Sequence, residues 1–396
     1  MIKLDFLQSL DNKLEENKNV QSNKKKKRGN IIFVVLFFLL ILFPVLTFTP
    51  QKDVSYSENR MLTALDFSNA PGIGDKIDVA EKWFSDHLGF RDEMFRYVMG
   101  AKYYMFGVIN YLDMTEGSDG QWYSIDRYQE MDYTGVDPYL TEEQLEVDVN
   151  GLVKVNEWMK DRGTPFVVMI NPDKIEVEDQ WLPKRYIKNK DGFRADRFAR
   201  ALRQNGVPTV LSKEALLAYE GDEHLFWDST DVTHWNYLGA YLGYENLMEE
   251  LVKYKEVPVL SYDDFNFEEQ TVDSSFIWGI EWADTTKVWN FDNSMIDSDS
   301  DLPEELSFVQ TYYHFHNHDL EDENSKILIA GDSYIEEYLM DPLKHTYTDV
   351  YFVIGYQNRD AVLRMTEMIE PDVVLFEWAS RMYPRMNGGV GAEWGL

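Results

Sequence analysis

The most informative absence in this 396-residue chain is cysteine, of which there is none. Disulfide bonds, thiol catalysis and cysteine-ligated metals are therefore excluded. Basic side chains are also in short supply, because 38 Lys and Arg face 70 Asp and Glu and the formal net charge is −32. So acidic a protein is repelled by a phosphate backbone, and we expect no nucleic-acid partner.

Internal repeats and long low-complexity segments are absent as well. The hydrophobic share of 44% is enough for a large core, and the length suits two or three domains or one domain with additions. These features predict a folded globular body.

Long apolar runs are limited to one, residues 31–48 (IIFVVLFFLLILFPVLTF), which carries no charge. A helix of this length crosses a hydrocarbon core of about 30 Å. The basic run Lys24–Arg28 precedes it, and positive charge stays on the cytoplasmic side. We therefore expect a single transmembrane helix over residues 31–49 in the plasma membrane, a cytoplasmic N-terminus and an extracellular C-terminal domain. A cleaved signal peptide is the alternative, but no small-x-small cleavage pattern follows the run.

The rest of the chain divides by composition. Residues 1–30 form a basic cytoplasmic segment with a net charge of +4. Residues 50–120 form a tether and a helical lead-in, with apolar positions at helical spacing over residues 76–106. Residues 121–396 form the main domain.

Four short apolar segments predict strands that are buried on both faces, as in a parallel sheet. They are TPFVVMINP (164–172), KILIAGDS (326–333), DVYFVIG (349–355) and PDVVLFEW (371–378). Helical patterns at residues 141–163 and 358–370 alternate with them. The sequence therefore predicts an α/β three-layer sandwich with a mostly parallel central sheet, whose sites lie beyond the carboxyl ends of the strands.

Ser333 follows one of these strands and precedes the helix-like IEEYLM. A serine at such a junction exposes its hydroxyl near backbone N–H groups and the positive end of a helix, which can hold an oxyanion. Gly331 allows the sharp turn. The alternative interpretation is an ordinary helix N-cap, for which Asp332 and Ser333 are both favoured.

A serine nucleophile needs a base, usually a histidine that a carboxylate orients. In DVTHW (231–235), Asp231 lies three residues before His234, close enough in a turn to accept its Nδ1 hydrogen. The alternative is a structural histidine in an ordinary loop.

His314, His316 and His318 alternate along one segment and can bind a metal if they share one face of a strand. A polar, aromatic-rich strand shows the same alternation, and the acidic residues begin only at Asp319. We assign no metal to them, and their role stays open.

Several segments match a known family in order, over about residues 55–385. They are SENRML, FSDHLGFRDEMFR, GSDGQWY, RGTPFVVMINPDKIEVEDQWLP, THWNYLGAY, LIAGDSY and PDVVLFEWASRMY. With the N-terminal anchor, this arrangement resembles the SGNH hydrolase-like proteins of the AlgX/AlgJ alginate O-acetyltransferase group, and especially their Gram-positive relatives called DHHW proteins.

The resemblance implies an SGNH hydrolase-like domain in which Ser333 is the nucleophile, His234 the general base and Asp231 its orienter. The family usually has Asp two residues before the His, where this chain has Val232. Either the loop has one extra residue and Asp231 or the more distant Asp228 serves, or the triad is degraded.

Four further residues are candidates for the oxyanion hole or for substrate contacts. Asn171 and Lys174 match the family's Pro-Asn-Lys-like loop, and Asn171 is the candidate for a second oxyanion donor. Arg381 matches a Glu/Arg feature together with Glu377, where an ion pair with a purely structural role is the alternative. Trp235 belongs to the family's His-Trp motif.

The resemblance implies a membrane-anchored extracellular O-acetyltransferase that acts on a cell-surface or secreted polysaccharide. A multi-pass membrane acyltransferase would supply the acyl groups, and the chemistry calls for no cofactor and no metal. Two alternatives remain: a carbohydrate esterase with the same triad, and a catalytically inactive glycan-binding or assembly partner of a membrane acyltransferase.

Overall fold

The computed structural model divides the chain into two compact units, Met1–Val108 with Phe276–Ile280, and Ile109–Ser275 with Glu281–Leu396. It describes residues 30–50, 54–55, 60–68, 70–107, 113–135, 141–189, 192–277, 280–301, 309, 311–354, 359–385 and 394. Nearly all of the basic segment predicted over residues 1–30 lies outside this range. The predicted boundaries at residues 31, 50 and 121 stay predictions.

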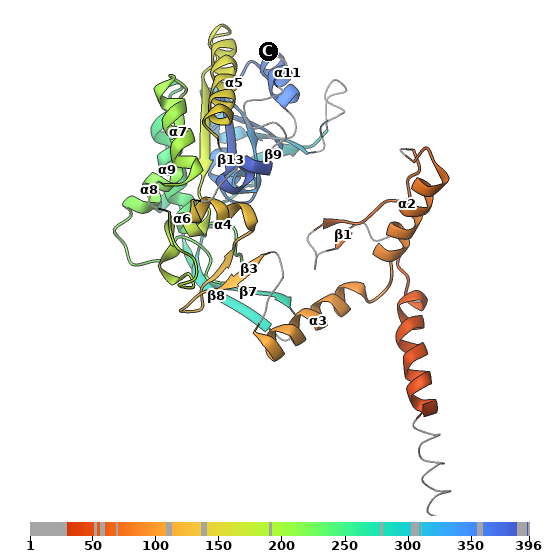
Figure 1. The fold of residues 1–396 in the computed structure, drawn as a ribbon. Helices are drawn as coiled ribbons and strands as arrows, with labels where there is room; N and C mark the ends of the chain where they lie inside the picture. Colours follow the sequence, from red (N-terminus) through yellow and green to blue (C-terminus); the bar gives the residue numbers. More distant parts are fainter. Residues whose placement is uncertain are drawn as a thin grey trace, which may run out of the picture. The chain divides into compact units, whose positions relative to one another are not determined.

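In the first unit, residues 30–46 are helical and α2 (Ile73–Asp86) and α3 (Arg91–Phe106) follow (Figure 1). The segment predicted as helical over residues 76–106 is thus interrupted, because Phe90 adopts a left-handed backbone conformation with φ of 62° and starts a new helix. Within the described part of the chain, no helix is both long enough and apolar enough to cross a membrane. The transmembrane helix over residues 31–49 therefore stays a prediction.

The second unit is built on a seven-stranded sheet, and the four predicted strands occupy its middle. The strand order is β6 (Thr209–Leu211), β5 (Phe166–Asn171), β13 (Val373–Ala379), β11 (Lys326–Gly331), β12 (Asp349–Ile354), β10 (Tyr312–Asn317) and β9 (Ile296–Asp299). The first five strands are parallel, and β10 runs antiparallel to both of its neighbours. The prediction of an α/β fold with a mostly parallel central sheet is confirmed.

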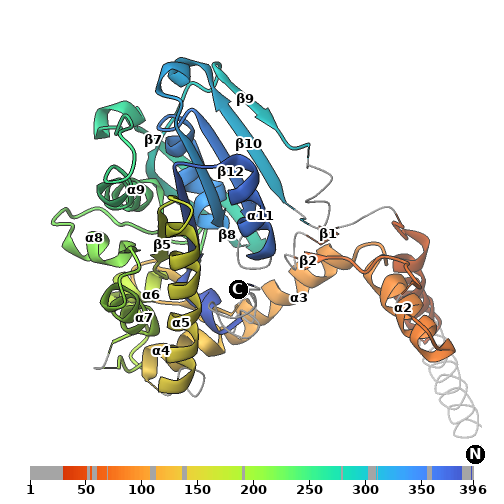
Figure 2. The ribbon, with the colours of Figure 1, turned by 90° about the horizontal axis from the view of Figure 1, so that it is seen from above.

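Helices cover both faces of this sheet (Figure 2). Alternate residues of β11 face opposite sides, because Ile327 and Ile329 belong to one core and Leu328 and Ala330 to the other. The first core is completed by α9 (Tyr237–Leu251) and α10 (Met340–Lys344). The second is completed by α5 (Glu142–Lys160), α7 (Arg194–Gln204) and α11 (Arg359–Ile369). The parallel strands are therefore apolar throughout because both of their faces are buried.

Local signals explain where the covering helices begin. The Thr141 side chain accepts a hydrogen bond from the amide of Gln144, and Glu142 and Glu143 occupy the first turn of α5. This unit also contains the antiparallel pair β3 (Met114–Glu116) with β4 (Trp122–Ser124) and most of the pair β7 (Glu268–Ile277) with β8 (Ile280–Val288). Its short helices include α4 (Arg127–Thr134), α6 (Lys174–Val177) and α8 (Ser212–Ala218).

Candidate functional site

Ser333 lies two residues beyond the carboxyl end of β11, where the chain turns into a helical segment. The turn passes close to the neighbouring strand β13. A Cβ atom at Gly331 would lie 2.9 Å from Oε2 of Glu377, so only glycine allows this approach without displacing a buried carboxyl group. Burial and the nearby charge of Asp332 raise the pKa of Glu377 well above its usual value.

The side chain of Asp332 fixes the turn. Its Oδ1 accepts a hydrogen bond from the amide of Tyr334 at 3.0 Å, and its Oδ2 accepts one from the amide of Ala379 on β13 at 2.8 Å. Among the described residues, none accepts a hydrogen bond from the Ser333 amide, which heads the helical segment. Asp332 thus takes the N-cap role, and the Ser333 N–H is left available for an oxyanion.

A π-helical turn over Ile335–Leu339 follows Ser333 and continues into α10. Such turns are rare and occur frequently at functional sites. Here the turn carries Tyr338, whose side chain reaches the histidine loop described next.

The histidine loop, residues 224–236, is held against the start of α9 by Asn236. The side-chain oxygen of Asn236 accepts hydrogen bonds from two amides in the first turn of α9, and its Nδ2 donates to the carbonyl oxygen of His224 at 2.7 Å. A β-bridge between Phe226 and Trp235 closes the loop. The backbone on both sides of His234 is therefore fixed.

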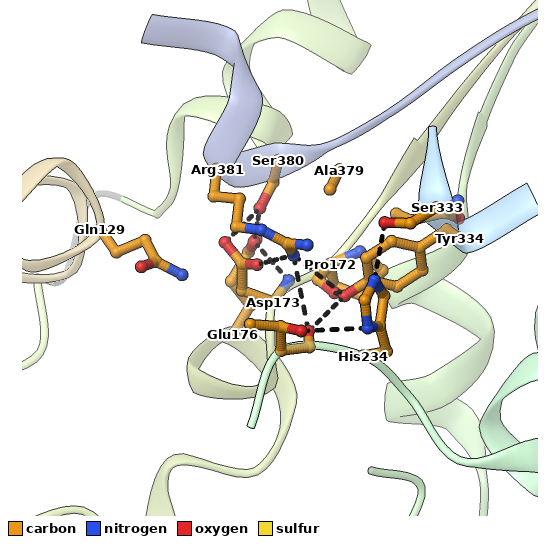
Figure 3. A network of polar contacts seen from close by, with 12 residues as sticks. Gln129, Pro172, Asp173, Glu176, His234, Ser333, Tyr334, Ala379, Ser380 and Arg381 are labelled. Atoms are coloured by element: carbon orange, nitrogen blue, oxygen red, sulfur yellow. Dashed lines mark hydrogen bonds and ion pairs between the residues drawn. The ribbon is translucent and has the colours of Figure 1, made fainter. Parts of the chain in front are cut away.

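The structure brings Ser333, His234 and Asp231 into one chain of hydrogen bonds. Nε2 of His234 lies 2.8 Å from Oγ of Ser333, and its Nδ1 lies 2.7 Å from Oδ2 of Asp231. Figure 3 shows the imidazole of His234 directed toward the hydroxyl of Ser333. Only 10% of the His234 side chain is exposed, so little water competes for these contacts. This is the geometry that a nucleophile, its base and the orienting carboxylate require.

Asp231 is saturated with hydrogen bonds. Its Oδ1 accepts from the amide and the hydroxyl of Thr233 at 2.9 and 2.8 Å and from the amide of His234 at 3.2 Å. Burial alone would raise the pKa of Asp231, but the charge of His234 and the hydrogen bonds from His234 and Thr233 lower it below its ordinary value. The carboxylate is therefore ionised at neutral pH.

Asp228 faces a different histidine. Its Oδ1 lies 2.5 Å from Nδ1 of His224 and accepts a hydrogen bond from Nε2 of Gln121 at 2.8 Å. The two candidates left open by the sequence are thus separated: Asp231 contacts His234, and Asp228 contacts His224.

Two tyrosines that the sequence did not single out pack against His234. The ring of Tyr334 lies 4.9 Å from the imidazole, and its hydroxyl lies 2.8 Å from the carbonyl oxygens of Pro172 and Thr233. The hydroxyl of Tyr338 donates to Oδ2 of Asp231 at 3.3 Å. The sequence signal for them is the spacing of four residues just after Ser333, which directs both side chains to one side of a helix.

Arg381 lies beside this cluster (Figure 3). Its Nη1 forms an ion pair with Asp173 at 2.7 Å and lies 3.5 Å from the carbonyl oxygen of Thr233 and from the hydroxyl of Tyr334. The guanidinium therefore connects the ends of β5 and β13 to the backbone next to His234. Arg381 therefore forms the ion pair that a structural role requires. Only 11% of its side chain is exposed, so little of it can contact a substrate from solution.

Lys174 and Asn171 are enclosed. Nζ of Lys174 donates to the carbonyl oxygens of Trp122 and Trp227 at 3.0 and 2.7 Å, and burial lowers its pKa to about 8. Nδ2 of Asn171 donates to Glu377 at 2.7 Å, and its Oδ1 accepts from the hydroxyl of Ser212. Neither side chain contacts Ser333 or His234. The contacts assign both residues to holding the loops around the site.

Trp235 is fully buried in the core under α9, and its ring lies 4.9 Å from that of Tyr334. A Cβ atom at Gly243 would lie 2.5 Å from this ring, so the glycine makes room for it. Trp235 therefore supports the neighbouring His234 from behind and has no surface for a substrate.

A cavity of about 320 Å³ adjoins the histidine loop on the side of His224. Most of the charged residues in its lining are acidic, namely Asp222, Glu223, Asp228, Glu269 and Asp284, and Lys287 is a counter-charge. Neither Ser333 nor His234 lines it, so this cavity and the Ser333 site are separate features.

Comparison with known proteins identifies the family. Residues 132–340 match the model of the family described as "SGNH hydrolase-like domain, acetyltransferase AlgX", more than half of the chain, and the protein belongs to this family. The match includes the histidine loop and Ser333, and it confirms the family predicted from the motifs. No match was found among curated proteins.

Several solved structures match the chain at low sequence identity, with TM-scores below 0.5. PatB1 of Bacillus cereus is 12% identical with a TM-score of 0.48, and the alignment covers 68% of this chain and 96% of PatB1. A DHHW family protein of Eubacterium siraeum is 15% identical with a TM-score of 0.44, covering 61% and 86%. The O-acetyltransferase domain of Pseudomonas putida AlgJ is 17% identical with a TM-score of 0.40, covering 68% and 92%.

Proposed function

We propose that this protein is an O-acetyltransferase that transfers acetyl groups to hydroxyls of a polysaccharide through a Ser333–His234–Asp231 triad. The observation that carries the proposal is the unbroken chain of hydrogen bonds from Ser333 through His234 to Asp231, at 2.8 and 2.7 Å. Membership of a family of acetyltransferase domains supports the type of group that is transferred.

In the first half-reaction, Oγ of Ser333 attacks the carbonyl carbon of an acetyl ester while Nε2 of His234 takes the hydroxyl proton. The Ser333 N–H, at the positive end of the helical segment, stabilises the oxyanion. The leaving alcohol receives the proton from His234, and an acetyl-serine remains. Asp231 accepts the Nδ1 hydrogen and stabilises the imidazolium that forms in between.

In the second half-reaction, a sugar hydroxyl attacks the acetyl-serine while Nε2 of His234 takes its proton. The tetrahedral intermediate collapses to the sugar ester, and the proton returns to Oγ of Ser333. The base therefore acts twice, and no redox partner or cofactor is needed. A water molecule at the same position would give hydrolysis, which is the esterase alternative.

We place this reaction at the outer face of the plasma membrane. The apolar run 31–48 and the basic run Lys24–Arg28 support a membrane tether with the N-terminus inside. A tethered enzyme meets its acceptor at the cell surface, and a multi-pass membrane acyltransferase is the proposed source of acetyl groups. The polysaccharide and the membrane acyltransferase are thus the proposed partners.

The test uses the full-length chain, an activated acetyl ester as donor and an oligosaccharide as acceptor. We expect acetylated oligosaccharide from the wild type and none from Ser333→Ala. Release of acetate without sugar acetylation would replace the transferase with the esterase. If the wild type and Ser333→Ala consume the acetyl ester at the same rate as the buffer alone, both the transferase and the esterase proposals are contradicted. The catalytically inactive glycan-binding partner then remains.

A further inference from the structure

The three alternating histidines take different positions, with His314 and His316 on β10 and His318 at the start of the next 3₁₀ helix. Only His316 and His318 remain candidates for metal binding. The ring of His314 stacks on Tyr351 at 4.2 Å, and its Nε2 lies 2.8 Å from Asp349. His316 and His318 instead lie together, with ring centroids 4.8 Å apart. Glu321 on the following 3₁₀ helix, His318–Glu323, joins them, and one ligand atom from each of these three residues lies within 4.8 Å of the other two.

The atoms that face one another are nitrogens and a carboxylate oxygen. Nδ1 of His318 lies 2.9 Å from Oε1 of Glu321, and Nε2 of His316 lies 3.7 Å from the same oxygen. Two imidazoles and one carboxylate form a ligand set that proteins use for Zn²⁺. Ca²⁺ and Mg²⁺ prefer oxygen ligands alone, so this set favours a transition metal.

Each histidine also has a carboxylate on its second nitrogen. Nδ1 of His316 lies 3.0 Å from Asp349, and Nε2 of His318 lies 2.8 Å from Asp297. Carboxylates placed in this way fix the tautomer and the ring orientation of metal-binding histidines. If both rings donate to these carboxylates, the two remaining nitrogens present lone pairs to Glu321. The lone pairs of the two nitrogens and the carboxylate of Glu321 then repel one another, and a cation bound between these three atoms removes that repulsion.

The backbone holds this arrangement in place. The strand register pairs His316 with Asp349 on one side and with Asp297 on the other. Asn317, between the two histidines, is buried, and its Nδ2 donates to the carbonyl oxygen of Lys344 at 2.9 Å. The sheet therefore holds His316 in place, and the buried Asn317 fixes the point where His318 follows. His318 and Glu321 lie on the 3₁₀ helix and are exposed, so an ion from solution can reach them.

We propose that His316, His318 and Glu321 form a Zn²⁺-binding site at the β9–β10 edge of the sheet, with Asp349 and Asp297 as outer partners. The bound ion would connect β10 to the 3₁₀ helix that leads into β11. This site shares no residue with the Ser333–His234–Asp231 triad. The proposal of metal binding is therefore independent of the proposed acetyl transfer.

The rival is a metal-free cluster in which both histidines only form hydrogen bonds and ion pairs with these carboxylates. The experiment is titration of Zn²⁺ by calorimetry into the metal-stripped, full-length chain without a polyhistidine tag, near neutral pH. We expect one Zn²⁺ per chain. We also expect a tetrahedral absorption spectrum when Co²⁺ replaces Zn²⁺, which a nonspecific surface ion would not give.

Three variants and one control make the test specific. His318→Asn and the exposed Glu321→Gln should each weaken binding, the former by about 100-fold or more, and Asp349→Asn should weaken it about 10- to 100-fold. His345→Asn, a histidine outside the cluster, should bind like the wild type. Absence of Zn²⁺ binding to the wild type, or equal affinity in Glu321→Gln and His345→Asn, would overturn the proposal in favour of the ion-pair cluster.

Discussion

The histidine loop contains two histidine–aspartate pairs that differ in their surroundings. His234 and Asp231 are three residues apart in the sequence, and His224 and Asp228 are four apart. Both pairs join a ring Nδ1 to a carboxylate oxygen at short distance. The carboxylate contact alone therefore does not distinguish a candidate base from a structural histidine.

The difference lies on the other nitrogen of each ring and in its exposure. Nε2 of His234 meets Oγ of Ser333, and 10% of its side chain is exposed. His224 packs its ring against Trp181, and 36% of its side chain is exposed. The imidazole of His234 is thus poised as a base, because its second nitrogen contacts a nucleophile and little of its ring is exposed to water.

The largest expected effect separates the two histidines. Because His234 takes the serine proton, His234→Ala should lower the rate of acetyl transfer on the order of 10⁴-fold or more. The matched variant His224→Ala should stay near the wild-type rate. Initial rates with an activated acetyl ester, on protein shown to be folded by circular dichroism, provide the measurement. Similar losses in both variants would show that the loop acts as a unit and would contradict the distinction.

The second comparison concerns the two aspartates. Asp231→Asn should lower the rate by about 10³- to 10⁴-fold, because an amide can donate to Nδ1 and favour the wrong tautomer of His234. Asp228→Asn should change the rate little. The ratio of kcat/KM for the two variants is the readout, and a larger loss in Asp228→Asn would assign the orienting role to the other pair.

A smaller effect is expected for Tyr338, which donates to Asp231 at 3.3 Å. Tyr338→Phe removes this hydrogen bond and also the one that the hydroxyl accepts from Nε1 of Trp227 at 2.8 Å. It should lower kcat by up to about tenfold with KM nearly unchanged if the tyrosine acts by positioning the triad. Tyr254→Phe, which loses a hydrogen bond to Glu250 at the far end of α9, is the control. A change confined to KM would place Tyr338 in substrate binding.

The smallest effect is on stability and follows from the lowered pKa of Asp231. Because the folded protein holds this carboxylate ionised below its ordinary pKa of 3.8, its contribution to the free energy of unfolding is complete above that value. The contribution is lost as the pH falls further, toward the pKa of the folded state. Denaturant unfolding of the wild type and Asp231→Asn from neutral to acidic pH should therefore give curves that converge as the pH decreases. A stability difference that is constant or grows toward acid would contradict this assignment.

The sequence predicted the elements that depend on local pattern. Four apolar segments became the parallel strands β5, β11, β12 and β13, because a strand buried on both faces needs no polar alternation. Local patterns, a strand-to-helix turn and a turn that holds an aspartate, marked Ser333 and His234 as candidates. Their roles as nucleophile and base came from the resemblance to the family.

Roles that depend on distant backbone could not be read in this way. Lys174 donates to carbonyl oxygens 52 and 53 residues away, and Asn171 reaches a glutamate 206 residues away. Such partners are set by how the strands and loops pack, and no local pattern reveals them. The sequence pattern also failed to predict the break between α2 and α3. The reason is that Phe90 adopts a left-handed backbone conformation, which phenylalanine disfavours.

The most direct test of the distinction between the two pairs is the location of the acetyl group during turnover. The full-length chain would be mixed with an activated acetyl ester, quenched rapidly, digested and mapped by mass spectrometry. We predict one acetyl group on Ser333 in the wild type and in Asp228→Asn, and none in His234→Ala. An acetyl group on another residue, or equal labelling of Ser333 in His234→Ala, would contradict a mechanism in which His234 activates Ser333.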